Sequence, residues 1–257
     1  MLNQIKNTIS DISVMTQRNL IRYRRLPQLL VFSTIQPVMF VLLFVYVFGG
    51  AINTPTAEYV DYLLPGIIVQ TVIFGAMATG IGLADDLSKG MIERFRSLPM
   101  ARSAVLAGRI ISDTLRNLFV VLLMTLVGLL LGFDVKTSFG GYLGAMAITL
   151  LLGFSFSWIS ALIGVSVKNV ETAQTAGFIW VFPLVFASSI FVPIATMPDW
   201  LQTIAKHSPI TATVDTVRAL ILGGGFQSQL GNALWWALAI VAVFMPWAVH
   251  RYRTSAV

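Results

Sequence analysis

The chain has 257 residues, a formal net charge of +6 and no cysteine. Hydrophobic residues make up 56% of it and charged residues only 11%, whereas a soluble domain carries about 25% charged residues. Because so few charges cannot cover a surface exposed to water, the composition excludes a soluble enzyme and predicts an integral membrane protein. The absence of cysteine excludes disulfides and thiolate metal sites. We interpret the basic excess as a topology signal and expect no nucleic-acid partner.

The N-terminal segment, residues 1–28, places Ile5, Ile9, Ile12 and Met15 at helical spacing. This stripe predicts an amphipathic helix that lies in the cytoplasmic interface of the membrane and contacts its lipids. Two roles remain open for this helix. It is either an orientation signal alone, or a helix that also packs against the transmembrane core.

Six apolar stretches have about the 20 residues that a transmembrane helix needs. Their approximate bounds are 29–51, 62–84, 105–131, 141–165, 174–192 and 231–249. Continuous apolar runs argue against a β-barrel, whose strands alternate in polarity. We therefore predict an all-α integral membrane protein with six transmembrane helices in one domain, 1–257. Small residues on the fourth stretch, among them Ser160 and Gly164, predict close helix packing, as do the GxxxG pairs Gly128–Gly132 and Gly140–Gly144.

The basic residues predict the orientation. Fourteen of the 17 lysines and arginines fall on one side of the six-span topology, and the exceptions are Lys136, Lys206 and Arg218. By the positive-inside rule the richer side is cytoplasmic, and both termini lie on it.

The polar stretch between the second and third spans contains a short predicted helix, bounded by Gly90 and Pro99. Apolar side chains within it are surrounded by charges, a combination that suits docking to a partner protein. The residues that we assign to such a contact are Met91, Ile92, Glu93, Phe95 and Arg96. The alternative is a short helix that rests on lipid headgroups.

Arg109, Asp113 and Arg116 share one helix face at the predicted cytoplasmic end of the third span. Charges at membrane depth are costly unless they are paired or face water. We therefore expect a buried ion pair, or a charged gate that faces a cytoplasmic vestibule.

Between the fifth and sixth spans, residues 193–226 contain two apolar helices too short to cross the membrane. The first carries Trp200; the second starts at Pro209 and is stopped by the glycines at 223–225. Asp215 and Arg218 stand at i, i+3 and can pair. The pattern predicts a re-entrant helical hairpin on the outer side.

Several kinds of chemistry have no residues to support them. The sequence contains no GxxxxGK[ST] motif and no cluster of metal ligands, and the centres of the predicted spans lack ionisable groups. We expect no catalytic site, no metal site and no bound cofactor in this chain. If the protein drives transport uphill, the energy comes from another subunit.

The chain as a whole resembles the ABC-2 type transporter permeases. Two stretches carry the resemblance best. The first is the cytoplasmic segment Gly90-Met-Ile-Glu-Arg-Phe-Arg-Ser-Leu-Pro99. The second is the outer segment, which starts with Met197-Pro-Asp-Trp-Leu-Gln, continues through Ser208-Pro209 to Arg218, and ends with Ala-Leu-Ile-Leu-Gly-Gly. Ala212 stands where the family usually has a polar or basic residue. Within the family, the chain looks closest to exporters of the daunorubicin-resistance kind.

The resemblance implies a bacterial cytoplasmic membrane protein without ATPase activity. ATP and Mg would bind two separate cytoplasmic ABC ATPase subunits, and the helix at about 91–98 would couple to them. A second permease, either another copy or a paralogue, would complete the transport path along spans one, two and five.

Aromatic side chains on those spans suit an amphiphilic cargo, although lipid-facing rings are the alternative. Our candidates for the path are Phe40, Phe44, Phe74, Phe178 and Phe182. The implied function is export of a drug or lipid-like molecule. Export of a lipid-linked oligosaccharide or polysaccharide, and a membrane assembly protein that transports nothing, remain alternatives.

Overall fold

The computed structural model describes residues 2–48, 59–96, 100–225 and 227–254, and all regular secondary structure in these ranges is helical. The elements in order are α1 (Leu2–Arg25), α2 (Pro27–Leu43), the π-helix η1 (Phe44–Phe48), α3 (Tyr59–Ser88), α4 (Met91–Arg96), α5 (Arg102–Leu130), α6 (Phe139–Ser166), α7 (Val170–Phe186), the 3-10 helix η2 (Ile194–Thr196), α8 (Asp199–Lys206), α9 (Pro209–Leu222) and α10 (Gln227–Thr254).

Four of the described helices, α3, α5, α6 and α10, are long and apolar enough to cross a membrane. The helix formed by α2 and η1, and α7 with its 17 residues, are shorter apolar elements. The long helices extend a few residues beyond the predicted apolar runs. At the fifth run the reverse holds, because α7 ends at Phe186 and not near residue 192.

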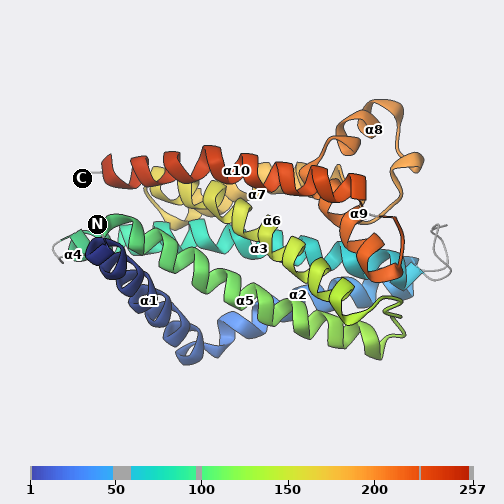
Figure 1. Cartoon of the computed structure of the whole chain (residues 1–257), viewed down its shortest axis with the longest axis horizontal. Helices are drawn as coiled ribbons and strands as arrows, with labels where there is room; N and C mark the ends of the chain where they lie inside the picture. The colour runs from blue at the N-terminus through green and yellow to red at the C-terminus, as the bar shows by residue number, and fades with distance from the viewer. Residues whose placement is uncertain (1, 49–58, 97–99, 226, 255–257) are drawn as a thin grey trace.

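The long helices lie side by side along the longest axis of the molecule (Figure 1). Both ends of the chain, together with α1 and α4, lie at one end of this bundle. Helix α8 lies at the opposite end. The two segments between spans that the sequence singles out, the polar one around α4 and the largely apolar one that contains α8, thus lie at opposite ends of the bundle.

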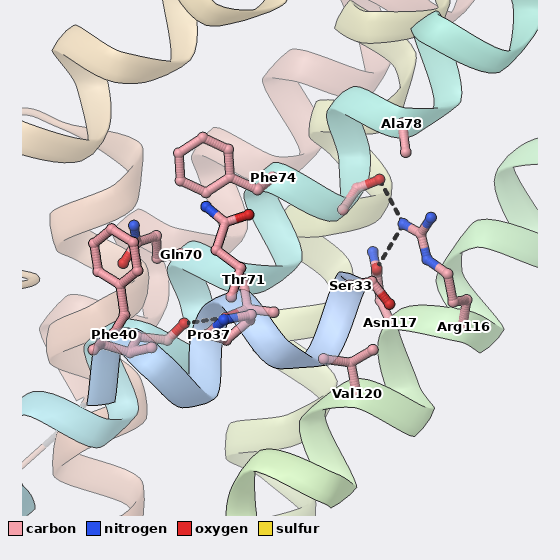
Figure 2. Close-up of a pocket in the computed structure, with 13 residues that line it drawn as sticks. Ser33, Pro37, Phe40, Gln70, Thr71, Phe74, Ala78, Arg116, Asn117 and Val120 are labelled. Atoms are coloured by element: carbon pink, nitrogen blue, oxygen red, sulfur yellow. Dashed lines mark hydrogen bonds between the residues drawn. The ribbon is translucent and has the colours of Figure 1, made fainter. Parts of the chain in front are cut away.

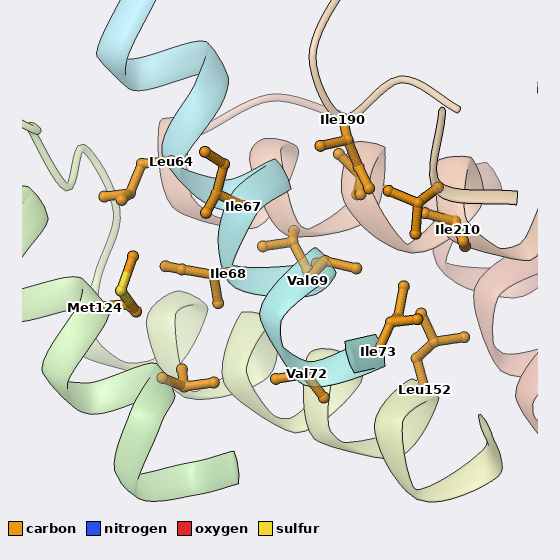
Figure 3. Packing of buried hydrophobic residues seen from close by; sticks show 14 of the residues in the cluster. Leu64, Ile67, Ile68, Val69, Val72, Ile73, Met124, Leu152, Ile190 and Ile210 are labelled. Carbon is orange, nitrogen blue, oxygen red and sulfur yellow. The ribbon is translucent and has the colours of Figure 1, made fainter. Parts of the chain in front are cut away.

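Helix α3 is the centre of the packing. It buries 22 of its 30 residues, since α2, α5, α6, α7 and α9 all contact it. Its apolar side chains point in every direction, toward Met124 of α5, Leu152 of α6 and Ile210 of α9 (Figure 3). A helix that is apolar all round is expected to be buried on all sides, and α3 is such a helix.

The closest contact between two long helices joins α3 to α6. A Cβ atom added at Gly164 would lie 2.3 Å from the carbonyl oxygen of Gly80, so only glycine allows the two backbones to approach this far. The predicted GxxxG pairs contribute less. Gly128 packs against Leu64, but a Cβ at Gly132 would meet nothing within 4 Å.

Helix α1 packs along the start of α5, where Gly108 lies against Met15. The face that it buries contains Met15, Asn19 and Tyr23. Of the predicted apolar stripe, Met15 lies on this buried face, whereas Ile9 is 61% exposed. The contact at Gly108 and the polar partners on α3 and α5 decide which face of α1 packs against the protein. The hydrophobic residues nearer the start of the helix do not.

We predict that Gly164→Ala lowers the thermal unfolding midpoint of the protein in detergent, with a loss of about 1–3 kcal/mol, because the added methyl group forces α6 away from α3. The matched control is Gly231→Ala in α10, where a Cβ would meet nothing within 4 Å. Alanine should be neutral there, or stabilising by about 0.5–1 kcal/mol through its helix propensity. Equal shifts in the two variants would contradict the close contact between α3 and α6.

Candidate functional site

Asp113 of α5 is fully buried where α1, α3 and α5 meet. Its carboxylate accepts hydrogen bonds from the Tyr23 hydroxyl, from Thr79 Oγ1 at 2.7 Å and from Arg109 Nε at 3.1 Å. Arg109 also donates to the carbonyl oxygen of Ala78 at 3.3 Å. A buried carboxylate is tolerated only when its oxygens are paired in this way. This group of side chains therefore joins three helices, and we call it the Asp113 junction.

Sequence reasoning missed Tyr23 and Thr79 as members of the junction. Burial, and then the charge of Asp113, raise the pKa of the Tyr23 hydroxyl from 10.0 to about 12, so this hydroxyl remains a hydrogen-bond donor at neutral pH. The spacing of Met15, Asn19 and Tyr23 on one face of α1 could have indicated the tyrosine. No local feature of the sequence marks Thr79.

Arg116 shares the helix face predicted for it and adjoins the junction, since its guanidinium lies 5.6 Å from the centre of the Tyr23 ring. Its Nη2 donates to the carbonyl oxygen of Gly75 at 2.7 Å and to Asn117 Oδ1 at 3.1 Å. Helix α5 begins at Arg102, so fourteen residues precede Arg116 in the helix and fourteen follow it. The sequence predicts Arg116 near the cytoplasmic end of the third span, whereas in the structure it is the middle residue of α5.

Helix α4 is attached to α1 through Phe95. The guanidinium of Arg18 lies 4.7 Å from the centre of the Phe95 ring, a cation–π contact, and the ring packs against the apolar cluster around Leu106 and Tyr252. The neighbouring end of α3 is tied to α1 by a salt bridge of 3.1 Å from Arg22 to Asp85. Phe95 therefore faces this chain's own core, at least in part.

Of the other candidate residues on α4, the structure places one side chain, that of Met91. Met91 is half-buried. The side chains of Ile92, Glu93 and Arg96, and residues 97–99, lie outside the described part of the chain.

The five candidate phenylalanines come together in space. Phe40 and Phe44 stack at 6.0 Å on the helix formed by α2 and η1, and Phe74 of α3 lies 5.8 Å from Phe182 and 6.3 Å from Phe178 on α7. Two further rings that sequence reasoning did not single out connect these groups. The full series, which we call the aromatic row, is Phe40, Phe44, Phe191, Phe186, Phe182, Phe178 and Phe74, with consecutive ring centres 5.0–6.3 Å apart.

Part of the aromatic row is open at the surface. Phe178, Phe182 and Phe186 are 38%, 43% and 51% exposed. They occupy successive turns of α7 at a spacing of four residues, which places them on one side of the helix. The row is therefore a continuous apolar strip that other molecules can contact.

At the opposite end from α4, Arg218 of α9 supports the chain where α7 has ended. Its Nη2 donates to the carbonyl oxygens of Ser189 at 2.6 Å and Ile190 at 3.0 Å, and its Nε to that of Tyr62 at 2.8 Å. Its Nη1 pairs with Asp215 at 3.2 Å, and its guanidinium lies 3.6 Å from the centre of the Tyr62 ring. These bonds replace the helical partners that the carbonyls after α7 have lost.

The helices beside Arg218 begin and end as the sequence indicates. The Ser208 side chain accepts a hydrogen bond from the backbone N–H of Ile210, which places Pro209 at the first helical position of α9. Gly223 ends α9 with a φ of 81°. Trp200 of α8 is 68% exposed.

We predict that Arg218→Met destabilises the protein by about 2–4 kcal/mol, because it leaves buried carbonyl oxygens of Tyr62, Ser189 and Ile190 without their donor. Thermal unfolding in detergent measures this loss. Lys206→Met on the exposed face of α8 removes the same charge, and we expect it to leave the midpoint within the error of wild type. A comparable loss in both variants would contradict the supporting role of Arg218.

Comparison with known proteins identifies the family. Residues 10–222 match the model of the ABC-2 type transporter family. The chain is 37% identical over 238 residues to a daunorubicin resistance ABC transporter permease protein of Streptomyces coeruleorubidus, covering 93% of this chain and 84% of that protein. It is 24% identical over 261 residues to a probable doxorubicin resistance ABC transporter permease protein of Mycobacterium tuberculosis, covering 98% and 92%. A putative transport permease of Cyanophora paradoxa is 26% identical over 230 residues, covering 85% and 79%. The chain therefore belongs to the ABC-2 type transporter family, as a membrane subunit of an ATP-binding cassette transporter.

Proposed function

We propose that the protein is the permease of an exporter that moves an amphiphilic molecule out across the bacterial cytoplasmic membrane. The observation that carries this proposal is the aromatic row, a continuous series of rings from α2, α3 and α7 that is partly open at the surface. Aromatic faces bind polycyclic or acyl-chain cargo without requiring a particular hydrogen-bond pattern. The relatives named for resistance to daunorubicin and doxorubicin support a cargo of this class.

In this proposal six helices span the membrane, namely α2 with η1, α3, α5, α6, α7 and α10, while α8 and α9 form a re-entrant hairpin on the outer side. Helix α7 with its 17 residues rises about 26 Å, a little less than the hydrocarbon core of about 30 Å. The backbone at 187–193, which Arg218 supports, supplies the remaining length. Both termini and α4 lie together, which agrees with a cytoplasmic position for the basic end of the bundle.

A second permease, either another copy or a paralogue, would cover the exposed side of the aromatic row, so that cargo passes between the two permeases. Two cytoplasmic ABC ATPase subunits would bind ATP and Mg and contact the α4 segments. The membrane subunit would then hydrolyse no ATP itself.

The contacts around α4 support a route for coupling. A movement of α4 would reach α1 through Phe95 and Arg18, and α1 would pass it to α3 and α5 through the Asp113 junction. Breaking a buried ionic network typically costs about 3–5 kcal/mol, so α1, α3 and α5 should move as one body. In this scheme Phe95 anchors α4 to its own chain, while Met91, Ile92, Glu93 and Arg96 contact the ATPase subunit.

We predict that Phe182→Ala and Phe74→Ala each raise the KM for ATP-driven uptake of daunorubicin into inside-out vesicles by about three- to tenfold, since each removes ring contacts of about 0.5–1.5 kcal/mol. The vesicles contain the permease with its ATPase subunits. Phe119→Ala is the control, because Phe119 of α5 is comparably exposed, at 49%, but lies outside the aromatic row. An unchanged KM in both row variants would exclude the row as the cargo path.

We predict that Glu93→Lys abolishes ATP-driven uptake and copurification of the ATPase subunits without lowering the thermal unfolding midpoint. The reversed charge would repel the basic surroundings of α4 and lose its partner on the ATPase. Glu171→Lys at the exposed start of α7 is the matched charge reversal and should retain both activities. If Glu93→Lys transports and copurifies as wild type does, the coupling assignment fails.

A further inference from the structure

Beside the aromatic row the structure contains a cavity of about 130 Å³ that sequence reasoning did not anticipate (Figure 2). It lies between α2, α3 and α5, and its wall includes Phe40 and Phe74 of the aromatic row. Its polar lining comes from three helices. The residues are Ser33 and Gln36 of α2, Gln70 and Thr71 of α3, and Arg116 and Asn117 of α5. The cavity thus has an apolar side, continuous with the row, and a polar side.

Two buried polar atoms in this wall have no hydrogen-bond partner among the described residues, Oε1 of Gln70 and Nε of Arg116. As whole residues, Gln70 is 5% exposed and Arg116 is 8% exposed. Buried polar groups are nearly always hydrogen-bonded, so two of them in the wall of one cavity indicate that a ligand supplies the missing contacts. The Gln70 amide can present either its oxygen or its nitrogen by a half-turn of the side chain.

The charge balance of the site favours an anion. Within the described residues no carboxylate lies within 4 Å of Arg116, because the nearby Asp113 is occupied by Arg109, Tyr23 and Thr79. Arg116 is also central in α5, where an uncompensated charge is most costly if the helix spans the membrane. A guanidinium in this position attracts a phosphate or a carboxylate and repels a cation. The Nε–H of Arg116 is the donor that can form a charge-assisted hydrogen bond to such an anion, because Nη2 already donates to Gly75 and Asn117.

The size of the cavity limits what enters it. Sites for drug-sized ligands enclose about 300–1,000 Å³, several times the space available here. The cavity is thus too small for a whole polycyclic or lipid molecule but large enough for a compact polar group. The rest of such a molecule would have to lie outside, where Phe40 and Phe74 lead to the aromatic row.

We propose that this cavity binds the anionic oxygen group, a phosphate or a carboxylate, of an amphiphile whose apolar part lies along the aromatic row. Arg116 and Asn117 donate to the anion, and Gln70 adds its amide. The position of the apolar part rests on the proposed export function, whereas the anion site does not. The amphiphile comes either from the membrane, as a phospholipid, or from the exported cargo.

A binding experiment that involves no transport tests the site. The probes are octyl phosphate and octyltrimethylammonium, two amphiphiles with the same chain and opposite charge. They are titrated into the purified permease with its ATPase subunits in a neutral maltoside detergent, and the thermal unfolding midpoint is recorded. We expect octyl phosphate to raise the midpoint in a saturable manner and the ammonium probe to leave it unchanged. Equal responses to the two probes would overturn the proposal.

Three variants assign the response to the cavity. We expect Arg116→Gln to raise the half-saturating concentration of octyl phosphate at least tenfold, and Arg116→Lys, which keeps the charge, to restore most of the affinity. Arg253→Gln, at the exposed end of α10, is the control for loss of a charge and should bind as wild type does. Wild-type affinity in Arg116→Gln would overturn the proposal.

Gln70→Leu provides an independent test of the cavity if the Arg116 variants fail to fold. Removal of an unpartnered buried amide should raise the midpoint of the ligand-free protein, yet weaken octyl phosphate binding about threefold. A residue with a purely structural role would not combine higher stability with weaker binding. Unchanged affinity in Gln70→Leu counts against the site.

The source of the amphiphile is determined by competition. If phosphatidylglycerol, but not phosphatidylcholine, displaces octyl phosphate in detergent, the occupant is an anionic membrane lipid. If neither lipid competes, and octyl phosphate stimulates ATP hydrolysis in vesicles that contain phosphatidylglycerol, the anion belongs to the cargo. Binding of octyl phosphate is measured without transport. The result therefore tests the anion site independently of the proposed export function, and either proposal can be refuted while the other stands.

Discussion

Burial of the Asp113 carboxylate is the constraint on which the rest of this structure depends. An ionised carboxyl group without water must have its oxygens occupied, and here Tyr23, Thr79 and Arg109 occupy them from three different helices. Since none of the three can move away without leaving a buried charge unpaired, α1, α3 and α5 are held in one arrangement. Helix α4 is joined to this body through Phe95 and Arg18, so the charged network around Asp113 also positions the proposed ATPase contact.

A second buried ion, Arg218, fixes the opposite end of the molecule in a different way. It binds backbone carbonyls where α7 has stopped, so that an interrupted helix retains hydrogen-bond partners that lipid could not provide. Between the two ends the long helices meet through apolar side chains and through the glycine contact of α3 with α6. The aromatic row lies beside the Arg218 end at Phe191 and continues along α7 to Phe178 and Phe74.

The outcome at individual residues shows where sequence reasoning was sufficient. Pro209 and Gly223 bound α9 as expected, because a proline start and a glycine stop act through local backbone geometry. Of the stripe predicted on α1, Met15 is buried and Ile9 is exposed, because the face of α1 that packs on the protein is the one that meets Gly108 and the Asp113 junction. In the GxxxG pair Gly128–Gly132, Gly128 packs against Leu64, whereas a Cβ at Gly132 would meet nothing within 4 Å. The spacing of apolar or small residues within one helix identifies a face, but the neighbouring helix decides which face is buried in the contact.

The sequence by itself determined the properties that depend on composition or on short stretches of the chain. These are residence in a membrane, a helical fold, the apolar runs, and the resemblance to ABC-2 permeases in two segments between the spans. Composition and local spacing are enough for these. Only the tertiary structure decided that Tyr23 meets Asp113 across 90 residues, that Arg218 meets Tyr62 across 156, and that Arg116 remains without a carboxylate beside a cavity. Such contacts depend on how helices rotate and cross when they pack, which is set by the shapes of all the side chains together and not by any one segment.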